Sequence, residues 1–194
     1  STIKLLTTAT ILEIFGSDYQ IQTPICYSGY IKDSTLYGNL YIEGRGDPTL
    51  GSRYVGNQQF LQKWTEEIRK AGIRHIKGDI IADASYFDLN ATNPAWLWED
   101  IGNYYAPGIA ALSYMDNTMT FTLKSGICGS RAEVINTYPE AENMRFDSYV
   151  ECANINYDGA YVHGIAFSNY RYLTGKIPSN RESFKIRGDM PNPP

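Results

Sequence analysis

The chain has 194 residues, and its 17 basic and 21 acidic side chains give a formal net charge of -4. This balance excludes the basic footprint of a nucleic-acid-binding protein and the polybasic patch that binds anionic lipid. Hydrophobic residues make up 43% of the chain, so we expect it to fold. No apolar run approaches the roughly 18 residues of a membrane span, so we expect no membrane-spanning helix in this sequence.

The N-terminal part of the chain is predicted to combine one helix with short strands. Apolar residues at helical spacing predict a helix over Thr2–Phe15, and Gly16 follows as its C-terminal stop. Short strands are expected at Tyr19–Thr23, Ile25–Ile31 and Leu36–Glu43, and a turn at Gly44–Pro48.

The clearest helix is predicted over Asn57–Ala71, directly before Gly72. Its apolar stripe consists of Phe60, Leu61, Trp64, Ile68 and Ala71. A short buried strand is expected over Gly78–Asp83. A turn of helix is expected over Pro94–Asp100, because proline suits the first turn of a helix.

The C-terminal half is predicted to consist of strands. Met115–Leu123 alternates apolar with polar residues, which indicates a half-exposed strand. Further strands are expected at Glu133–Tyr138, Phe146–Ile155, Ala160–Phe167, Tyr170–Lys176 and Phe184–Arg187. These strands follow one another without intervening helices, and the 16 tyrosines favour sheet. The predicted fold class is therefore α+β, with antiparallel sheets and few helices.

The cysteines and histidines do not indicate a metal site. Cys26, Cys128 and Cys152 form no Cys-x-x-Cys motif and no Cys/His cluster. Cys128 and Cys152 flank predicted strands and could pair in an oxidising compartment, but three free thiols fit the sequence equally well. His75 and His163 are each isolated in sequence from any carboxylate pair, so a histidine-based triad is not indicated.

A candidate nucleophile stands at the start of the first predicted helix. Ser1 and Lys4 have Ser-x-x-Lys spacing, and residues i and i+3 share a helix face, so the amine can reach the hydroxyl. A partly desolvated lysine can accept the serine proton, and a helix N-terminus favours the resulting anion. Taken alone, the spacing is a weak signal, and a surface serine and lysine on a helix explain it better.

Four segments extend this pattern over about the first 125 residues. They read STIKLLTT from Ser1, GNLYIEGRGDPTL from Gly38, AGIRHIKGDIIAD from Ala71 and WLWEDIGNYYAP from Trp96. In this order they resemble the serine D-alanyl-D-alanine carboxypeptidases, in particular the class C low-molecular-mass penicillin-binding proteins. The tyrosine-rich remainder is similar to the family only loosely.

The resemblance implies a serine-type D-Ala-D-Ala carboxypeptidase. Ser1 would attack the penultimate D-Ala carbonyl with Lys4 as base, and water would hydrolyse the acyl-enzyme. No metal or organic cofactor is implied. The implied partners are peptidoglycan stem peptides and, for the intact enzyme, β-lactams, in a periplasmic or secreted location of the cell envelope. An endopeptidase reaction differs only in its leaving group and stays open.

The chain also departs from the family. It contains no Ser-x-Asn, and Leu173–Lys176 reads Leu-Thr-Gly-Lys instead of Lys-Thr-Gly. In the family both motifs lie beyond the point where this chain stops, and its first residue is not Met. We therefore expect an N-terminal portion that is inactive alone. Residues 1–16 would form the nucleophile-helix edge of the transpeptidase domain, and residues 17–194 an accessory α+β region.

Asp100 and Tyr105 are the second pair of candidate site residues. The resemblance implies that they belong to the pocket for the stem-peptide side chain, whose diaminopimelate ends in an ammonium. A carboxylate beside an aromatic face suits such a cation. Alternatively, Asp100 caps a local turn and Tyr105 packs in the core. A rival function also stays open, in which the tyrosine-rich region is a non-catalytic envelope module that binds glycan or protein partners.

Overall fold

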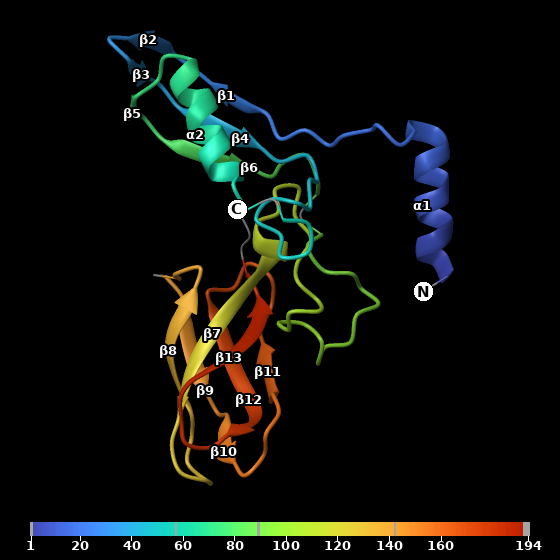
Figure 1. Ribbon diagram of the computed structural model, residues 1–194, viewed down its shortest axis with the longest axis vertical. Helices are drawn as coiled ribbons and strands as arrows, with labels where there is room; N and C mark the ends of the chain where they lie inside the picture. Colours follow the sequence, from blue (N-terminus) through green and yellow to red (C-terminus); the bar gives the residue numbers. More distant parts are fainter. Residues whose placement is uncertain (1, 57, 89, 142, 192–194) are drawn as a thin grey trace.

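The computed structural model describes residues 2–56, 58–88, 90–141 and 143–191. These residues form a helix that lies apart, a lobe of short strands covered by a second helix, and a β body built from the C-terminal strands (Figure 1). A long irregular segment connects the lobe to the β body and lies beside both.

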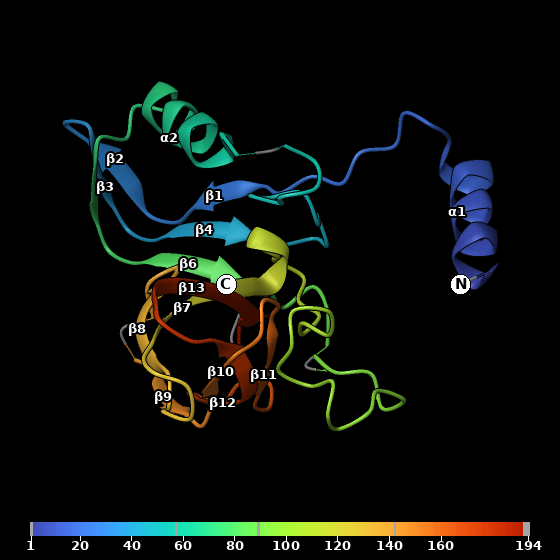
Figure 2. The same cartoon turned by 60° about the horizontal axis from the view of Figure 1, so that its bottom comes forward.

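The helix that lies apart is α1, Thr2–Phe15, with the predicted bounds. It ends where Gly16 adopts a positive φ of 78° and its N–H donates to the Leu12 carbonyl at 2.9 Å. None of its residues is buried, and Figures 1 and 2 both show it away from the rest of the chain. Its apolar side chains are therefore exposed to solvent.

The lobe contains six short strands in two three-stranded sheets. One sheet has the order β1-β4-β6 and the other β2-β3-β5. The bounds are β1 Ile25–Tyr27, β2 Tyr30–Lys32, β3 Thr35–Tyr37, β4 Leu40–Glu43, β5 His75–Lys77 and β6 Ile80–Asp83. The strand predicted over Tyr19–Thr23 does not form. The strand over Gly78–Asp83 is not buried as expected, since Ile80 is largely exposed.

Glycines divide the strands that the sequence predicts as continuous. Leu36–Glu43 becomes β3 and β4, because the chain bends at Gly38, where φ is +153°. A Cβ on Gly38 would collide with the Ser28 carbonyl, and one on Gly78 would collide with the Gly38 carbonyl. The segments at Ser28, Gly38 and Gly78 therefore approach one another closely. At this point each of the three segments passes from one sheet of the lobe to the other.

The helix α2, Phe60–Lys70, covers the lobe. It begins later than predicted, and Asn57 lies outside the described residues. Gly72 follows with a φ of 87°, as expected of a helix stop. The helix contributes Ile68 and Phe60 to two small cores of the lobe.

The β body confirms most strands predicted for the C-terminal half. Its sheets have the orders β13-β7-β8 and β10-β12-β11, with β9 also paired to β12. The strands are β7 Thr118–Ser125, β8 Glu133–Tyr138, β9 Arg145–Ser148, β10 Glu151–Ala153, β11 Gly159–His163, β12 Tyr170–Pro178 and β13 Arg181–Asp189. The main core lies between them and contains Met119, Phe121, Leu123, Val150, Val162, Leu173, Ile177 and Ile186.

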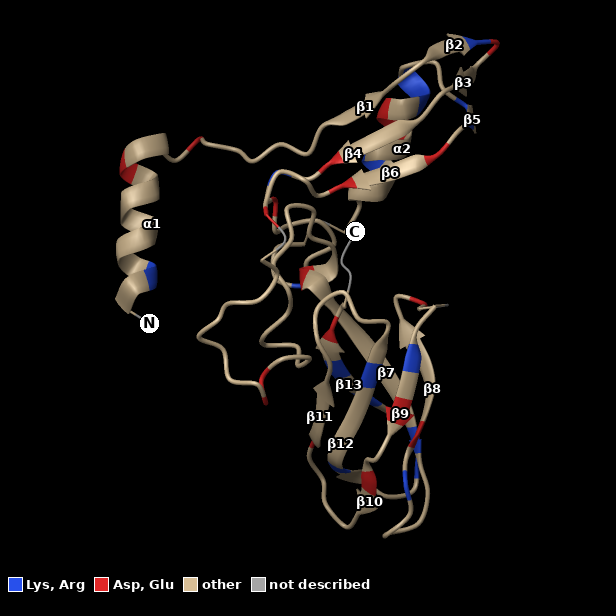
Figure 3. Cartoon of the chain, turned by 180° about the vertical axis from the view of Figure 1, so that it is seen from behind, with Lys and Arg blue, Asp and Glu red and all other residues tan. Residues whose placement is uncertain are grey.

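The fold class is α+β, as predicted, although not every strand pair is antiparallel. The pairs β7·β8, β7·β13 and β11·β12 are antiparallel, whereas β9 and β10 run parallel to β12. Acidic and basic residues are interspersed along the strands and loops of the β body (Figure 3). The thiols of Cys26, Cys128 and Cys152 are free, and that of Cys152 is buried.

The helical turn predicted over Pro94–Asp100 is wrong. The segment forms successive turns, because Asn93 accepts the Ala95 N–H through its side chain at 2.8 Å and the Trp96 N–H through its carbonyl at 3.0 Å. The irregular segment ends at the short 3-10 helix η1, Met115–Asn117, where β7 begins.

Candidate functional site

Of the proposed nucleophile and base, the structure describes only the base, Lys4. Lys4 is on the first turn of this helix and is exposed. Ser1 lies outside the described residues. The pairing of Ser1 with Lys4 therefore stays a prediction.

Asp100 and Tyr105 line one cavity of about 320 Å³. The other lining residues are Glu99, Tyr161, His163 and Thr174. The cavity thus has two walls. The turn wall consists of Glu99, Asp100 and Tyr105 from the irregular segment, and the strand wall consists of Tyr161 and His163 of β11 with Thr174 of β12.

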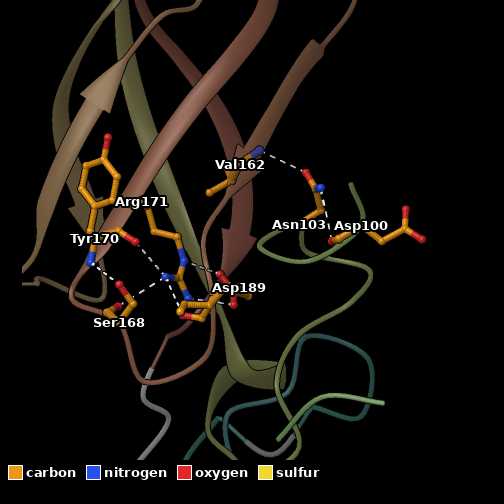
Figure 4. Close-up of polar contacts among 8 residues, drawn as sticks. Asp100, Asn103, Val162, Ser168, Tyr170, Arg171 and Asp189 are labelled. Carbon is orange, nitrogen blue, oxygen red and sulfur yellow. Dashed lines mark hydrogen bonds and ion pairs between the residues drawn. The ribbon is translucent and has the colours of Figure 1, made fainter. Parts of the chain in front are cut away.

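Consecutive turns place the side chains of the turn wall. The Asp100 N–H donates to the Leu97 carbonyl at 3.0 Å, and the Asn103 N–H donates to the Asp100 carbonyl at 3.1 Å. The next turn closes where the Ala106 N–H donates to the Asn103 carbonyl at 3.1 Å. The carboxylate of Asp100 points away from Asn103 (Figure 4).

Tyr105 interacts directly with Asp100. Burial raises the pKa of the Tyr105 hydroxyl, and the charge of Asp100 and a hydrogen bond to its carboxylate raise it further. The Tyr105 side chain is still 51% exposed, so it does not pack in the core as the alternative interpretation had it. The two predicted residues are therefore neighbours at a surface cavity, and their role in binding stays a prediction.

The strand wall supplies neutral hydrogen-bonding groups. His163 Nε2 lies 2.8 Å from Thr174 Oγ1, and the imidazole stacks on the Tyr172 ring with centroids 4.8 Å apart. Burial lowers the pKa of His163, which favours the neutral imidazole at pH 7. The wall facing the carboxylates thus carries an imidazole and hydroxyl groups.

Sequence reasoning missed this role of His163. The histidine is isolated in sequence from any carboxylate pair, but β11 brings it to the cavity that Glu99 and Asp100 also line. Alternation along β11 places Tyr161 and His163 on one face of the strand. Nothing in the sequence shows which segment packs against that face.

The cavity chemistry suits a cationic group of a ligand. Two carboxylates lie together on the turn wall, and the aromatic ring of Tyr105 lies beside them. A charge-assisted hydrogen bond to Asp100 and the attraction of an ammonium to an aromatic face would both contribute to binding.

A second cavity lies against the lobe and has a different character. It measures about 210 Å³ and is lined mainly by apolar side chains, including Leu50, Phe60 and Trp64 of the lobe core.

In the part of the chain that the structure describes, no group of three His, Cys, Asp or Glu residues could hold a metal ion. None of the described helices is long and apolar enough to cross a membrane.

Comparison with known proteins identifies related sequences. A family model described as "D-Ala-D-Ala carboxypeptidase 3 (S13) family" matches residues 1–193. The chain is 32% identical over 113 residues to a D-alanyl-D-alanine carboxypeptidase of Actinomadura sp. (strain R39). It is 30% identical over 101 residues to the D-alanyl-D-alanine carboxypeptidase DacB of Haemophilus influenzae. These alignments cover 58% and 52% of this chain but only 20% of each relative.

The fold is similar to that of a solved protein. Crystal structures of penicillin binding protein 4 (dacB) from Haemophilus influenzae match 97% of this chain, with TM-scores of 0.73 and 0.63 and identities of 23% and 22%. The chain covers 41% and 39% of those structures, of which the second is complexed with a β-lactam. The architecture described above is therefore shared with a region of that protein.

Proposed function

Because the chain belongs to the D-Ala-D-Ala carboxypeptidase 3 (S13) family, we propose that it is the N-terminal portion of a serine-type D-Ala-D-Ala carboxypeptidase that acts on peptidoglycan stem peptides. The family match over nearly the whole chain carries this proposal. It agrees with the resemblance on which the sequence prediction was based. The cavity at Asp100 supports the proposal that the substrate is a peptidoglycan stem peptide.

The proposed reaction begins at Ser1. Its hydroxyl attacks the carbonyl of the penultimate D-Ala, and the hydroxyl proton passes to the Lys4 amine. As the peptide bond breaks, that proton passes to the departing amine of the terminal D-Ala. Water then hydrolyses the ester between Ser1 and the shortened peptide. An endopeptidase reaction would follow the same steps with a different leaving amine.

Two parts of the chain have different proposed roles. Residues 1–16 contribute the nucleophile helix to a transpeptidase domain, and residues 17–194 form an accessory region that contributes the substrate pocket. The Ser-x-Asn and Lys-Thr-Gly motifs, which relay protons and line the oxyanion hole in the family, do not occur in this sequence. The chain alone is therefore proposed to be inactive.

The proposed substrate feature is the ammonium of a diaminopimelate side chain. In the cavity it would lie against Asp100, with the Tyr105 ring beside it. Such stem peptides occur in the bacterial cell envelope, so a periplasmic or secreted location is proposed as well.

Labelling with a fluorescent penicillin tests the proposed reaction. An enzyme that continues through the two missing motifs should be acylated, and Ser1→Ala in that enzyme should abolish labelling. The 194-residue chain should not be labelled. If the longer protein binds intact peptidoglycan but is never labelled, the chain belongs instead to a non-catalytic envelope binding module.

A further inference from the structure

The cavity at Asp100 is assembled from two distant parts of the chain. Its turn wall lies in the irregular segment before β7, and its strand wall lies in β11 and β12 of the β body. A cavity of this kind keeps its width only if the two parts are held together. The contacts that join them are therefore candidates for control of ligand selectivity.

One side chain bonds to both walls. Asn103 Nδ2 donates to the carbonyl oxygens of Glu99 at 3.0 Å and Asp100 at 3.3 Å. Asn103 Oδ1 accepts the N–H of Val162 at 3.0 Å, and Val162 lies between Tyr161 and His163 of the strand wall. Figure 4 shows this amide between the turn and β11.

The environment of Asn103 makes these bonds hard to replace. The residue is only 2% exposed, so water cannot readily take over the bonds. β11 is an edge strand of its sheet, and the Val162 N–H is directed to Asn103 instead of a neighbouring strand. Donor and acceptor are both needed here, and a side-chain amide supplies both.

Neighbouring backbone contacts bring the turn close to β11. Gly102 has a φ of +102°, and a Cβ there would lie 2.7 Å from the Val162 carbonyl oxygen and 2.8 Å from the Gly164 nitrogen. The Gly102 carbonyl accepts the Asp189 N–H of β13 at 2.9 Å. Asn103 also forms a backbone bridge with Gly188 of the same strand. The turn is therefore fixed against two strands of the β body.

Asn103 is not among the residues that line the cavity. Any effect on a ligand must come through Asp100 and the strand wall. The charge-assisted hydrogen bond of an ammonium to a carboxylate is short, about 2.7–2.9 Å, and small displacements weaken it. The position of the Asp100 backbone relative to β11 therefore matters for binding.

We propose that Asn103 is a positioning residue that fixes the separation between the turn wall and the strand wall, and thereby the selectivity for a stem peptide with an ammonium-bearing side chain. This inference rests on the proposed function of the Asp100 cavity. It assigns to Asn103 no contact with the reacting atoms.

The test uses the enzyme extended through the missing motifs and the variant Asn103→Ala. We expect kcat/KM for a D-Ala-D-Ala peptide containing diaminopimelate to fall roughly five- to thirtyfold, as for the loss of one or two hydrogen bonds. The loss should lie mainly in KM, because substrate binding is affected and the chemical step is not. A peptide with an uncharged side chain, and acylation by penicillin, should change less than about twofold.

Ser125→Ala is the matched control. Ser125 is also buried in the β body and also makes two hydrogen bonds, to the Pro178 carbonyl at 2.7 Å and from the Arg181 N–H at 2.9 Å. It lies at the opposite end of β7 from the junction with the irregular segment. Its loss should lower stability without changing the preference between the two peptides.

Asp100→Asn separates failure of this inference from failure of the pocket assignment. If Asp100→Asn changes the preference but Asn103→Ala does not, Asn103 is not a positioning residue and the pocket assignment stands. If Asp100→Asn has no selective effect, the pocket assignment fails, and the inference fails with it. In the double variant Asp100→Asn, Asn103→Ala, the loss of kcat/KM for the diaminopimelate peptide should not exceed the loss in Asp100→Asn alone.

Amide exchange in the unaltered enzyme tests the inference without depending on the folding of a variant. The Val162 amide should exchange several times more slowly when the diaminopimelate peptide saturates the enzyme, because the ligand would hold both walls together. Unchanged exchange at Val162 would overturn the proposal. Equal losses of Asn103→Ala with both peptides and with penicillin would also overturn it.

Discussion

Arg171 and Asp189 form a buried bidentate ion pair in the β body. Arg171 Nε lies 2.7 Å from Asp189 Oδ1, and Arg171 Nη2 lies 2.9 Å from Asp189 Oδ2. The side chains are 0% and 4% exposed. Arg171 Nη1 also donates to the carbonyls of Ile165, Ser168 and Tyr170. Figure 4 shows Ser168 and Tyr170 beside the guanidinium. The ion pair joins β12 to the end of β13. The backbone N–H of Asp189 donates to the Gly102 carbonyl, so the same residue also contacts the segment that carries the turn wall.

Breaking this pair should strongly destabilise the chain. Arg171→Met leaves a buried carboxylate without its partner, and we expect the free energy of unfolding to fall by about 3–5 kcal/mol. Urea denaturation measures this loss. The double variant Arg171→Met, Asp189→Leu removes both charges and should recover much of the stability.

The exposed pair of Lys124 and Glu182 is the control. Its charged atoms are 2.8 Å apart, but the side chains are 52% and 87% exposed. Lys124→Met should change the unfolding free energy by less than about 1 kcal/mol. A similar small effect of Arg171→Met would contradict the structural role of the buried pair.

His163 should make stability depend on pH below neutrality. Burial lowers its pKa from the ordinary value of 6.5, and it faces Thr174 and the Tyr172 ring, with Glu99 and Asp100 lining the same cavity. The unfolded chain therefore takes up a proton at a higher pH than the folded chain. Stability should be lost as the pH falls from about 6.5 toward the lower folded-state pKa.

The variant His163→Gln isolates this contribution. Melting temperatures of the two proteins should be compared between about pH 7.5 and pH 5.5. The unaltered chain should lose more stability on acidification than His163→Gln, because titration of all other groups is common to both. Parallel curves would show that burial does not lower the pKa of His163.

The exposed helix α1 should be the least protected element. None of its residues is buried, and a helix of 14 residues is marginal in water without packing. We expect rapid amide exchange across Thr2–Glu13 in the 194-residue chain, together with slow exchange across β7, whose Phe121 and Leu123 are fully buried. Protection of α1 in this chain would show that it packs against the lobe or the β body.

The elements that could be predicted from sequence are those with strong local periodicity. The bounds of α1 and β8 match the prediction, and the strand predicted over Met115–Leu123 forms as β7, although Met115–Asn117 is a 3-10 helix. The break at Gly38 could not be predicted, because it depends on a close approach of the distant Gly78. Local patterns do not report contacts between segments far apart in the sequence.

Some residues of the candidate site could likewise be identified from the sequence, whereas others depend on contacts between distant segments. Asp100 and Tyr105 were found through a family resemblance, and the structure brings them to one cavity. His163 and Asn103 were not found, since the first depends on the placement of β11 and the second on a hydrogen bond to an edge strand. Gly102 and Asn103 together indicate only a turn in the sequence.

The most direct test of the substrate assignment is the effect of Asp100→Asn on two reactions of the extended enzyme. The variant keeps the shape of the side chain but removes its charge. We expect kcat/KM for the diaminopimelate peptide to fall roughly ten- to a hundredfold, as for the loss of a hydrogen bond between charged groups, while penicillin acylation stays nearly unchanged. Glu99→Gln, at the more exposed carboxylate of the same wall, should have a smaller effect. Equal losses in both reactions would show that Asp100 is structural, and no loss in either would show that the ammonium binds elsewhere.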